Sequence, residues 1–471
     1  MVFSSLLFIF VFLPIFLLVY YLLPHRWRNL FIVIGGYFFY SWGAPKFAII
    51  LFFTITIDYL ISLYLVKIKS SQKKYLLITS IILNLGLLAY FKYSNFFIGQ
   101  INWLLVFTNL PSLPWKEVIL PIGISFIVFQ ELSYIIDVYR GNIKPARTLI
   151  DFAAFLMLFP QIIAGPIIRY IDVCEQLKSR AHNIDNFYYG IKRFSIGLSK
   201  KILIANTISP VADAMFHLNS VRDLSSPLAW LGILSYSIQI YFDFSGYSDM
   251  AIGMAKMLGF DFKENFNRPY IAKSITDFWA RWHISLSTWM KEYLYIPLGG
   301  NRISTKRTYI NLWIVFLISG LWHGANWNFI LWGAFHGFLL VNERIFLLKW
   351  LSKIPKYLQI GFTFFVINLS WVLFREENLS LAIKFYTRLF SLGDFFKPIN
   401  IRMHEIINIK QIVVFIIAML IIFIPWKKIY KQNMYNKKTE VFFGLFNLGL
   451  FILAILELFN SKFNPFIYFR F

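Results

Sequence analysis

His323 is the group in this chain whose type and surroundings point most directly to chemistry. It lies in the segment 319–327 (SGLWHGANW), inside an apolar run from Thr308 to Val341. An imidazole titrates near neutral pH and is costly within a membrane, so it is a functional candidate by default. The run is about 34 residues, or roughly 51 Å as a helix, whereas two complete spans need about 40 residues. We therefore expect two short or broken helices that meet near Gly320 and Gly324, with His323 facing a cavity.

Two other histidines are compared with His323: His283, which has similar neighbours, and His336, which follows it in the same apolar run. His283 precedes it by about 40 residues and also lies between tryptophans. One interpretation is a base and an orienting partner that line one cavity, and the other is a pair that only holds the packing of helices. Residue type alone leaves both open. His336 is about three and a half turns beyond His323 and is interpreted as a packing histidine.

The segment 241–250 places Asp243 and Asp249 together with two serines among aromatic residues. Paired carboxylates can do acid–base work or hold a cation. The simpler interpretation, which we favour, is helix capping together with salt bridges to Arg268, Lys273 or Arg281.

A basic loop follows the glycine pair Gly299-Gly300 and contains Asn301, Arg302, Lys306 and Arg307. A flexible basic loop can hold the phosphates of a nucleotide-bearing acyl donor. It can equally be topological charge alone, and the spacing does not decide between the two.

The segment 278–293 has a strong helical pattern. Its large apolar residues recur at helical spacing and form one face: Trp279, Trp282, Leu286, Trp289, Met290 and Tyr293. Arg281, Ser285 and Glu292 fall off that face. The pattern predicts one amphipathic helix, with Asp277 as its N-cap, in the membrane interface or beneath the bundle of spans.

The composition of the chain is that of a membrane protein, so membrane helices must position these groups. Of 471 residues, 58% are hydrophobic and 20% aromatic, and the mean hydropathy is +0.62. We predict an all-α polytopic fold of about ten to twelve crossings with re-entrant or interfacial helices around a central cavity. It forms one domain, 1–471, with its core at 118–345 and further spans within 357–460. The predicted spans are 3–23, 30–42, 47–66, 75–90, 118–136, 228–244, 361–374, 412–424 and 441–456, and the run 308–341.

The net charge of +23 favours a membrane topology over nucleic-acid binding. Lys and Arg gather in short loops between apolar runs, as the positive-inside rule predicts, and no soluble basic domain is evident. The first run has neither a basic leader nor a small-residue cleavage site, so we expect a retained span. The basic clusters at 25–28 and 67–74 can both be cytoplasmic, which predicts an external N-terminus. Asp58, Gln130, Glu131 and Asp137 lie in or beside apolar runs and are weak candidates to line a path.

Several other site classes are excluded by motif. Cys174 is the only cysteine, which rules out an internal disulfide, and its acidic neighbours do not favour a thiolate. No metal signature, phosphate-binding loop or Gly-x-Ser-x-Gly elbow is present. We therefore expect no metal and no bound cofactor, and ATP-driven transport by this chain alone is disfavoured.

Taken together, the motifs resemble those of the membrane-bound O-acyltransferase family, in its alginate O-acetylase and peptidoglycan O-acetyltransferase branch. The resemblance extends from the N-terminus to about Arg375. It is carried by the segments 120–126, 159–166, 240–250, 264–267, 281–289, 295–302 and 322–324. Two departures are Ala280, where the family often has a second Arg, and Lys291-Glu292 in place of Arg-Asp.

The resemblance implies an O-acyltransferase in the bacterial cytoplasmic membrane, surrounded by lipid, whose key histidine is His323 and whose second motif histidine is His283. It further implies an acetyl group taken from a cytoplasmic donor, acetyl-CoA, and delivered outside to a periplasmic SGNH-type acetyltransferase that esterifies a polysaccharide. Two alternatives stay open. One is D-alanyl transfer to teichoic acid from a carrier protein, and the other is a non-enzymatic saccharide or lipid flippase.

Acyl transfer from a thioester to a hydroxyl needs a base at the acceptor oxygen and a donor aimed at the oxyanion. Our hypothesis makes His323 the base and His283 the orienting or stabilising partner. The expected supporting residues are Asp243, Arg281, Trp322 and Asn326, and the expected donor-binding residues are Arg302 and Asn301.

Overall fold

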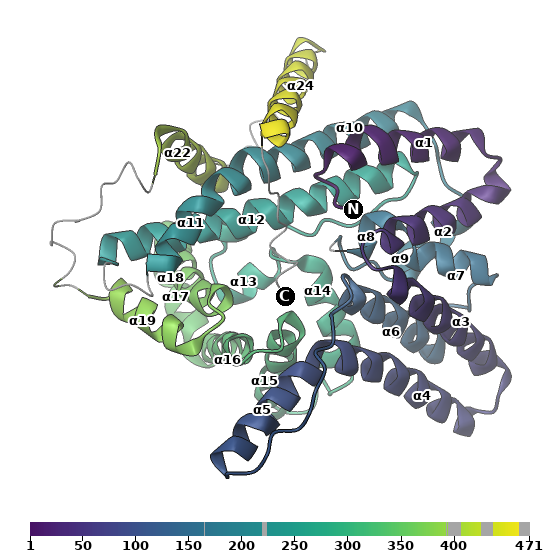
Figure 1. The fold of residues 1–471 in the computed structure, drawn as a ribbon, viewed down its shortest axis with the longest axis horizontal. Helices are drawn as coiled ribbons and strands as arrows, with labels where there is room; N and C mark the ends of the chain where they lie inside the picture. Colours follow the sequence, from purple (N-terminus) through teal and green to yellow (C-terminus); the bar gives the residue numbers. More distant parts are fainter. Residues whose placement is uncertain (164, 219–223, 392, 394–406, 425–436, 461–471) are drawn as a thin grey trace. The chain divides into compact units, whose positions relative to one another are not determined.

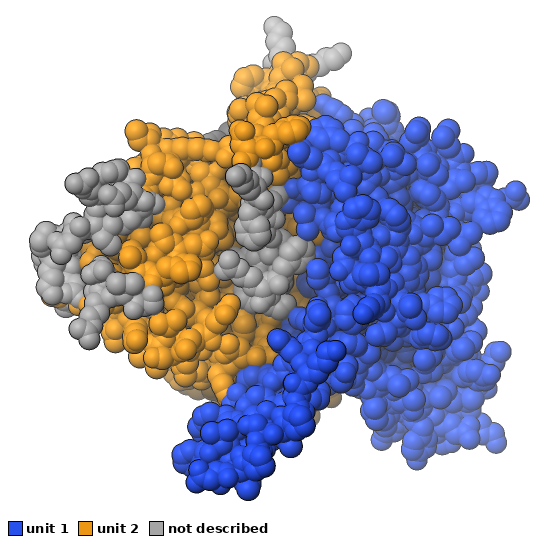
Figure 2. All heavy atoms as spheres, in the orientation of Figure 1, with its two compact units in different colours: residues 1–191, 251–263 blue, residues 192–250, 264–471 orange. Residues whose placement is uncertain are grey.

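The computed structural model describes residues 1–471 except 164, 219–223, 392, 394–406, 425–436 and 461–471. Every regular element in the described ranges is helical (Figure 1), so the predicted all-α class is confirmed. The chain divides into two compact units (Figure 2). Unit 1 contains residues 1–191 and 251–263, and unit 2 contains residues 192–250 and 264–471. The assignment of a single domain stays a prediction.

Unit 1 is built from short and long helices of the first half of the chain. They are η1 (Phe8–Phe12), α1 (Leu13–Leu22), α2 (His25–Ser41), α3 (Pro45–Lys67), α4 (Ser70–Leu88), η2 (Ala89–Tyr93), α5 (Ser94–Phe107), α6 (Ile124–Arg140), α7 (Leu149–Leu156), α8 (Phe159–Ile162) and α9 (Tyr170–Lys178). Two helices contribute residues to both units, α10 (Ile184–Ser199) and α12 (Ser226–Met257).

Unit 2 contains the remaining helices. They are η3 (Lys200–Ala205), α11 (Asn206–Leu218), η4 (Pro269–Ile271), α13 (Ile275–Trp279), α14 (Ile284–Met290), η5 (Lys291–Tyr295), α15 (Thr305–His323), α16 (Trp327–Asn342), η6 (Glu343–Leu347), α17 (Leu348–Leu351), α18 (Lys356–Arg375), α19 (Leu379–Leu389), α22 (Ile409–Phe423) and α24 (Lys437–Asn460).

Five helical stretches in the described residues are long and apolar enough to cross a membrane. They are Pro45–Lys67, Ser71–Phe107, Trp327–Leu351, Lys356–Arg375 and Thr439–Asn460, and two shorter apolar helices are Phe8–Leu22 and Ile409–Phe423. A helix of about 20 apolar residues matches the hydrocarbon thickness. The chain is therefore a multi-pass membrane protein, while the total of ten to twelve crossings stays a prediction.

The predicted span 118–136 is wrong in its first part. Helix α6 begins only at Ile124, and Gly123 before it has φ +79°, which ends the extended segment in a left-handed turn. A Cβ on Gly123 would lie 2.4 Å from the carbonyl oxygen of Ile162, so the two backbones approach too closely for a side chain. Apolar composition continues through this turn, so the hydropathy pattern alone placed the start of the helix too early in the sequence.

Candidate active site

The predicted break in the long apolar run is confirmed. Helix α15 ends at His323 and α16 begins at Trp327. A Cβ on Gly320 would lie 2.2 Å from the carbonyl oxygen of Phe329, and one on Gly324 would lie 2.3 Å from the Phe329 ring. Glycines at these two positions therefore let α15 and α16 pack with their backbones in close approach, as small residues do between membrane helices.

His323 lies at the C-terminus of α15 in an aromatic environment. Its side chain is buried, with 3% of the residue exposed. The centroid of its ring is 4.9 Å from that of Trp322, 5.0 Å from Trp332 and 5.2 Å from Phe374. Such an environment excludes bulk water and strengthens any polar interaction that the imidazole makes with a substrate.

The predicted single amphipathic helix over 278–293 is wrong. The segment forms the end of α13, a turn at 280–283, α14 and the start of η5, and the apolar residues of the predicted face are buried in these elements and the turn. The predicted N-cap is also wrong, because Ser274 caps α13 by accepting a hydrogen bond from Asp277 N at 3.1 Å. The Asp277 carboxylate instead accepts from Arg281 Nε at 2.7 Å.

His283 occupies the end of the turn that breaks this helix. Its φ is +45°, a left-handed conformation that costs a non-glycine residue about 1–3 kcal/mol and persists only where the surroundings enforce it. The backbone on either side is tied to the loop before it, since Ile284 N donates to Asn265 O at 3.0 Å. Strain of this kind clusters at functional sites.

Asn265 fixes the orientation of the His283 ring. Its Oδ1 accepts from Ser285 N at 3.1 Å and from Ser285 Oγ at 2.9 Å, and it lies 3.2 Å from His283 Nδ1. Its Nδ2 donates to Ser248 Oγ at 3.1 Å. The backbone N–H of Ser285 can only donate, and this establishes that the end of the amide facing it is the oxygen. Because Oδ1 can only accept, His283 Nδ1 carries the hydrogen, and Nε2 is the nitrogen that can take a proton in the neutral ring.

The turn that carries His283 lies outside the membrane-spanning helices, and the ring is fully buried, with 0% exposed. Burial lowers the pKa of His283 below its ordinary value, so the ring is neutral at physiological pH. A neutral, oriented imidazole is the form that a general base requires.

Trp322 connects the two predicted histidines. The centroid of its indole is 6.1 Å from that of His283 and 4.9 Å from that of His323. The structure thus brings His283, His323 and Trp322, predicted from distant parts of the sequence, into one cluster within unit 2.

Asp243 and Asp249 form ion pairs, but not with the cations that the sequence suggested. Asp243 Oδ1 is 2.5 Å from Lys201 Nζ, and both side chains are buried, with 4% and 1% exposed. Asp249 pairs instead with Arg193 and Lys200, each at 2.6 Å. The predicted partners, Arg268, Lys273 and Arg281, are wrong because a different part of the chain covers this face of α12.

The close approach of two glycines explains that choice of partners. A Cβ on Gly197 would lie 2.5 Å from Gly246 O, and one on Gly246 would lie 2.7 Å from Gly197 O. This contact holds the end of α10 and the start of η3 against α12, so the cations of residues 193–201 are the ones that reach its carboxylates.

The other predicted supporting and donor-binding residues have separate local contacts. Arg281 is half-buried and binds Asp277 and the carbonyl oxygen of Asn267, beside the turn that carries His283. Asn326 is the N-cap of α16, since its Oδ1 accepts from Asn328 N at 3.1 Å. Asn301 and Arg302 lie exposed in the turn after Gly300, and their role in donor binding stays a prediction.

Three structural residues of the site were not predicted from the sequence. Glu343 is buried, and its carboxylate accepts the backbone N–H groups of Ile275 and Thr276, the first two residues of α13. Asn265 orients His283, and Lys201 neutralises Asp243, as described above. Asn265 lies in one of the motifs that carry the family resemblance, which is the signal that could have identified it.

His336 and Cys174 have environments that fit their predicted packing roles. Trp279 Nε1 donates to His336 Nδ1 at 3.3 Å, and His336 is fully buried beside Trp332. Cys174 lies half-buried on α9, and burial followed by the nearby charge of Glu175 raises the pKa of its thiol. A raised pKa keeps the sulfur protonated and unreactive.

The polar residues of the suggested path lie in unit 1. Asp58, Gln130, Glu131 and Asp137 are all buried, with at most 3% exposed. Ser80 Oγ and Asn84 Nδ2 donate to the two oxygens of Asp58, at 2.6 Å and 2.7 Å. Whether these groups line a path stays a prediction.

Comparison with known proteins gives matches over the whole chain. A sequence model of the membrane-bound O-acyltransferase family matches residues 144–355. A protein named probable alginate O-acetylase from Azotobacter vinelandii is 48% identical over 84% of this chain and 79% of its own length. A second protein of that name, from Pseudomonas putida, is 42% identical over the full length of both. A peptidoglycan O-acetyltransferase of Helicobacter pylori is 40% identical over 82% of this chain and 79% of its own.

Proposed function

The chain belongs to the membrane-bound O-acyltransferase family and is an O-acyltransferase, and we propose that it moves an acetyl group from a cytoplasmic donor to a polysaccharide outside the membrane. The donor in this proposal is acetyl-CoA, and the protein resides in the bacterial cytoplasmic membrane. The acceptor class is supported by the names of its relatives, since alginate and peptidoglycan both carry sugar hydroxyls.

The observation that carries the mechanism is the cluster of His283, Trp322 and His323. In the proposed reaction His323 takes the proton of the acceptor hydroxyl, and the oxygen attacks the thioester carbonyl. The new C–O bond forms, the C–S bond breaks, and the proton passes to the leaving thiolate to give the CoA thiol. His283 is held by Asn265 with Nε2 unprotonated, and this acceptor stabilises the positive charge that develops on His323 when it takes the proton.

The remaining residues take positioning roles in this proposal. Asp243 and Lys201 form a buried ion pair that stabilises α12, whose Phe244 ring contacts His283 at a centroid distance of 4.8 Å. Arg281 holds the turn before His283 through Asp277. Arg302 and Asn301, exposed after the glycine turn, bind the phosphates of the donor.

The immediate acceptor in this proposal is a periplasmic SGNH-type acetyltransferase, which would pass the acetyl group to the polysaccharide. A hydroxyl nucleophile on such a partner is chemically equivalent to a sugar hydroxyl for the step at His323. The proposal therefore predicts the same dependence on His323 with either acceptor.

The test uses the purified full chain in lipid nanodiscs with acetyl-CoA labelled in the acetyl group. The expected result is release of CoA thiol together with appearance of label on the acceptor. For the variant His323→Ala, the matched control is His217→Ala. This control removes an exposed histidine on α11 and should leave turnover unchanged. Turnover with a D-alanyl carrier protein and none with acetyl-CoA would assign the alternative acyl chemistry. Movement of a lipid-linked saccharide without thioester cleavage would contradict acyl transfer altogether.

A further inference from the structure

Unit 1 contains a group of cationic side chains that acyl transfer does not explain. The basic cluster, as we name it, consists of Arg28 on α2 and of Arg180 and His182 after α9, which all contact Tyr20 at the end of α1. It also includes His25 at the start of α2, whose charge interacts with that of His182. Arg28 Nη1 lies 3.2 Å from His182 Nδ1, and Arg180 Nε donates to the Tyr20 hydroxyl at 3.1 Å. Three groups that carry or can carry positive charge therefore contact one side chain, and a fourth interacts with them electrostatically.

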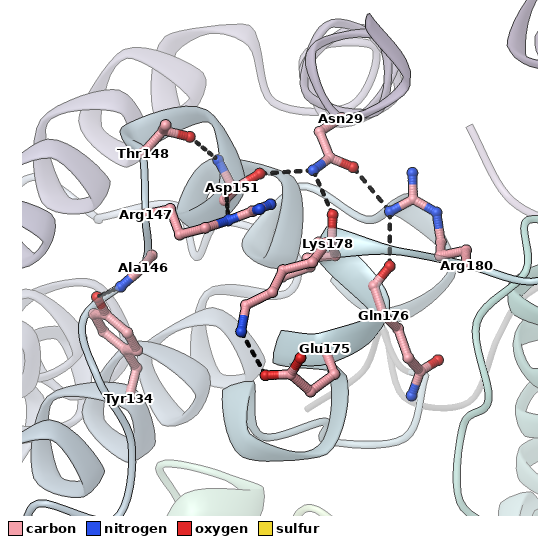
Figure 3. Close-up of polar contacts among 11 residues, drawn as sticks. Asn29, Tyr134, Ala146, Arg147, Thr148, Asp151, Glu175, Gln176, Lys178 and Arg180 are labelled. Carbon is pink, nitrogen blue, oxygen red and sulfur yellow. Dashed lines mark hydrogen bonds and ion pairs between the residues drawn. The ribbon is translucent and has the colours of Figure 1, made fainter. Parts of the chain in front are cut away.

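The protein does not neutralise this charge with a carboxylate. Neither Arg28 nor Arg180 takes part in any salt bridge within the part of the chain that the structure describes. Figure 3 shows that Asn29 stands between Asp151 and Arg180, donating to the carboxylate at 2.7 Å and accepting from Arg180 Nη1 at 2.8 Å. Asp151 thus reaches Arg180 only through a neutral amide.

Arg180 keeps unused hydrogen-bonding capacity. The residue is buried, with 7% exposed, and its Nη2 has no hydrogen-bond partner. The guanidinium carbon of Arg180 lies 4.6 Å from the centroid of the Phe260 ring. This cation–π contact stabilises the positive charge but does not neutralise it. A buried guanidinium with an unsatisfied nitrogen is costly unless a compensating anion is near.

The hydrogen bonds of the cluster show that His182 is neutral. The Tyr20 hydroxyl donates to Leu258 O at 2.9 Å, so its oxygen accepts from Arg180 Nε and from His182 Nε2, which lies 3.0 Å away. Arg28 Nη1, which can only donate, lies 3.2 Å from His182 Nδ1 and 3.3 Å from Nε2, so the ring offers it an unprotonated nitrogen. Burial, followed by the charges of Arg28 and Arg180, lowers the pKa of His182. An anion bound beside His182 would raise this pKa again.

The surroundings of the cluster match the headgroup region of a membrane. It lies where the apolar helix Phe8–Leu22 ends. Leu18 and Leu22 on that helix are 61% and 75% exposed, and Tyr21 and Trp27 are exposed beside them. Aromatic residues gather at the level of lipid headgroups, while exposed leucines face acyl chains. Positive charge above apolar surface is the complement of a phospholipid and not of a soluble anion.

We propose that the basic cluster is a binding site for the phosphodiester of an anionic glycerophospholipid, with Arg28, His182 and His25 in contact with the phosphate and Arg180 as the buried charge beneath. The acyl chains lie along Leu18 and Leu22. This inference is independent of the proposed acyl transfer, because it concerns residues that the transfer does not use.

The test measures lipid retained by the purified full chain after exchange in mixed phosphatidylglycerol and phosphatidylcholine, using native mass spectrometry. We expect phosphatidylglycerol to be retained in preference, and Arg28→Gln to reduce its retention about tenfold, since charge-assisted hydrogen bonds are the strong ones. The matched control is Arg26→Gln. It removes an equal charge two residues before Arg28, from a side chain that packs over the Trp27 ring. It should retain the lipid as the unsubstituted chain does.

Two further arms make the outcome decisive. Arg28→Lys keeps the charge and should retain the lipid to within about threefold, so that a loss in Arg28→Gln is not merely a folding defect. Inorganic phosphate and adenosine 3′,5′-bisphosphate should not displace the lipid at millimolar concentration. Equal retention in Arg26→Gln and Arg28→Gln would overturn the proposal. Displacement by either soluble phosphate would also overturn it and assign the cluster to a soluble ligand.

Discussion

Substitution of Asn265 by Ala tests whether the orientation of His283 matters for transfer. The change removes the oxygen that accepts from His283 Nδ1, Ser285 N and Ser285 Oγ, at 3.2 Å, 3.1 Å and 2.9 Å. A buried donor left without an acceptor costs about 1–3 kcal/mol. The Ser285 hydroxyl can rotate, so the two N–H donors set the cost, about 2–6 kcal/mol for unit 2 unless water enters. It also frees the His283 ring from the only tautomer in which Nε2 accepts a proton.

The effect on activity follows from that loss of orientation. General acid–base groups contribute about 10²–10⁴-fold to a rate, and we expect Asn265→Ala to lower kcat about 100-fold with a smaller change in KM. The assay is release of CoA thiol from acetyl-CoA by the purified chain, with the thermal unfolding midpoint measured in parallel. The control is Asn267→Ala, because the Asn267 side chain is exposed in the same loop.

Asn265→Asp separates orientation from stability. The carboxylate keeps the acceptor oxygen, but its charge favours the imidazolium and raises the pKa of His283. Since burial otherwise lowers that pKa and the reaction needs the neutral ring, the acidic limb of the kcat profile should move to higher pH. If Asn265→Ala leaves kcat within about threefold and Asn265→Asp leaves the profile in place, the orienting role is refuted.

Three predictions concern the framework of the site, each measured by thermal unfolding in detergent. Gly320→Ala should destabilise by about 1–3 kcal/mol, because its Cβ meets backbone at 2.2 Å, whereas Gly361→Ala meets nothing within 4 Å and should not destabilise. Glu343→Ala should cost about 2–3 kcal/mol by removing the acceptor of the first two N–H groups of α13, and an unchanged midpoint would contradict this capping role. Lys201→Met should cost about 3–5 kcal/mol by removing the cation 2.5 Å from the buried Asp243 carboxylate. Adding Asp243→Leu should recover most of it, and no recovery would refute the pairing.

The sequence allowed the class of fold and one half of the site to be predicted. The apolar run around His323 was too long for one span and too short for two, and the glycines marked where it breaks. Hydropathy and glycine spacing are local properties, so they identified α15, α16 and the histidine between them. The family motifs then linked His283 to His323, and the contacts of both with Trp322 agree with that link.

The other half depended on contacts that no local pattern encodes. The apolar spacing of 279–293 continues across α13 and α14, so the turn at His283 with its positive φ could not be distinguished from a continuous helix. Asp243 pairs with Lys201, 42 positions away, because Gly197 and Gly246 bring two helices together. Such partners are a consequence of packing, and only the folded chain reveals them.

The most direct test of the proposed function is single-turnover acetyl transfer by His323→Ala. The purified variant should insert in the membrane, keep the unfolding midpoint to within a few degrees, and release CoA thiol in the presence of acceptor at about 1% or less of the unsubstituted rate, the scale expected for loss of a general base. Retention of the full rate by a folded His323→Ala chain would contradict the assignment of His323 as the base, and with it the account of transfer given above.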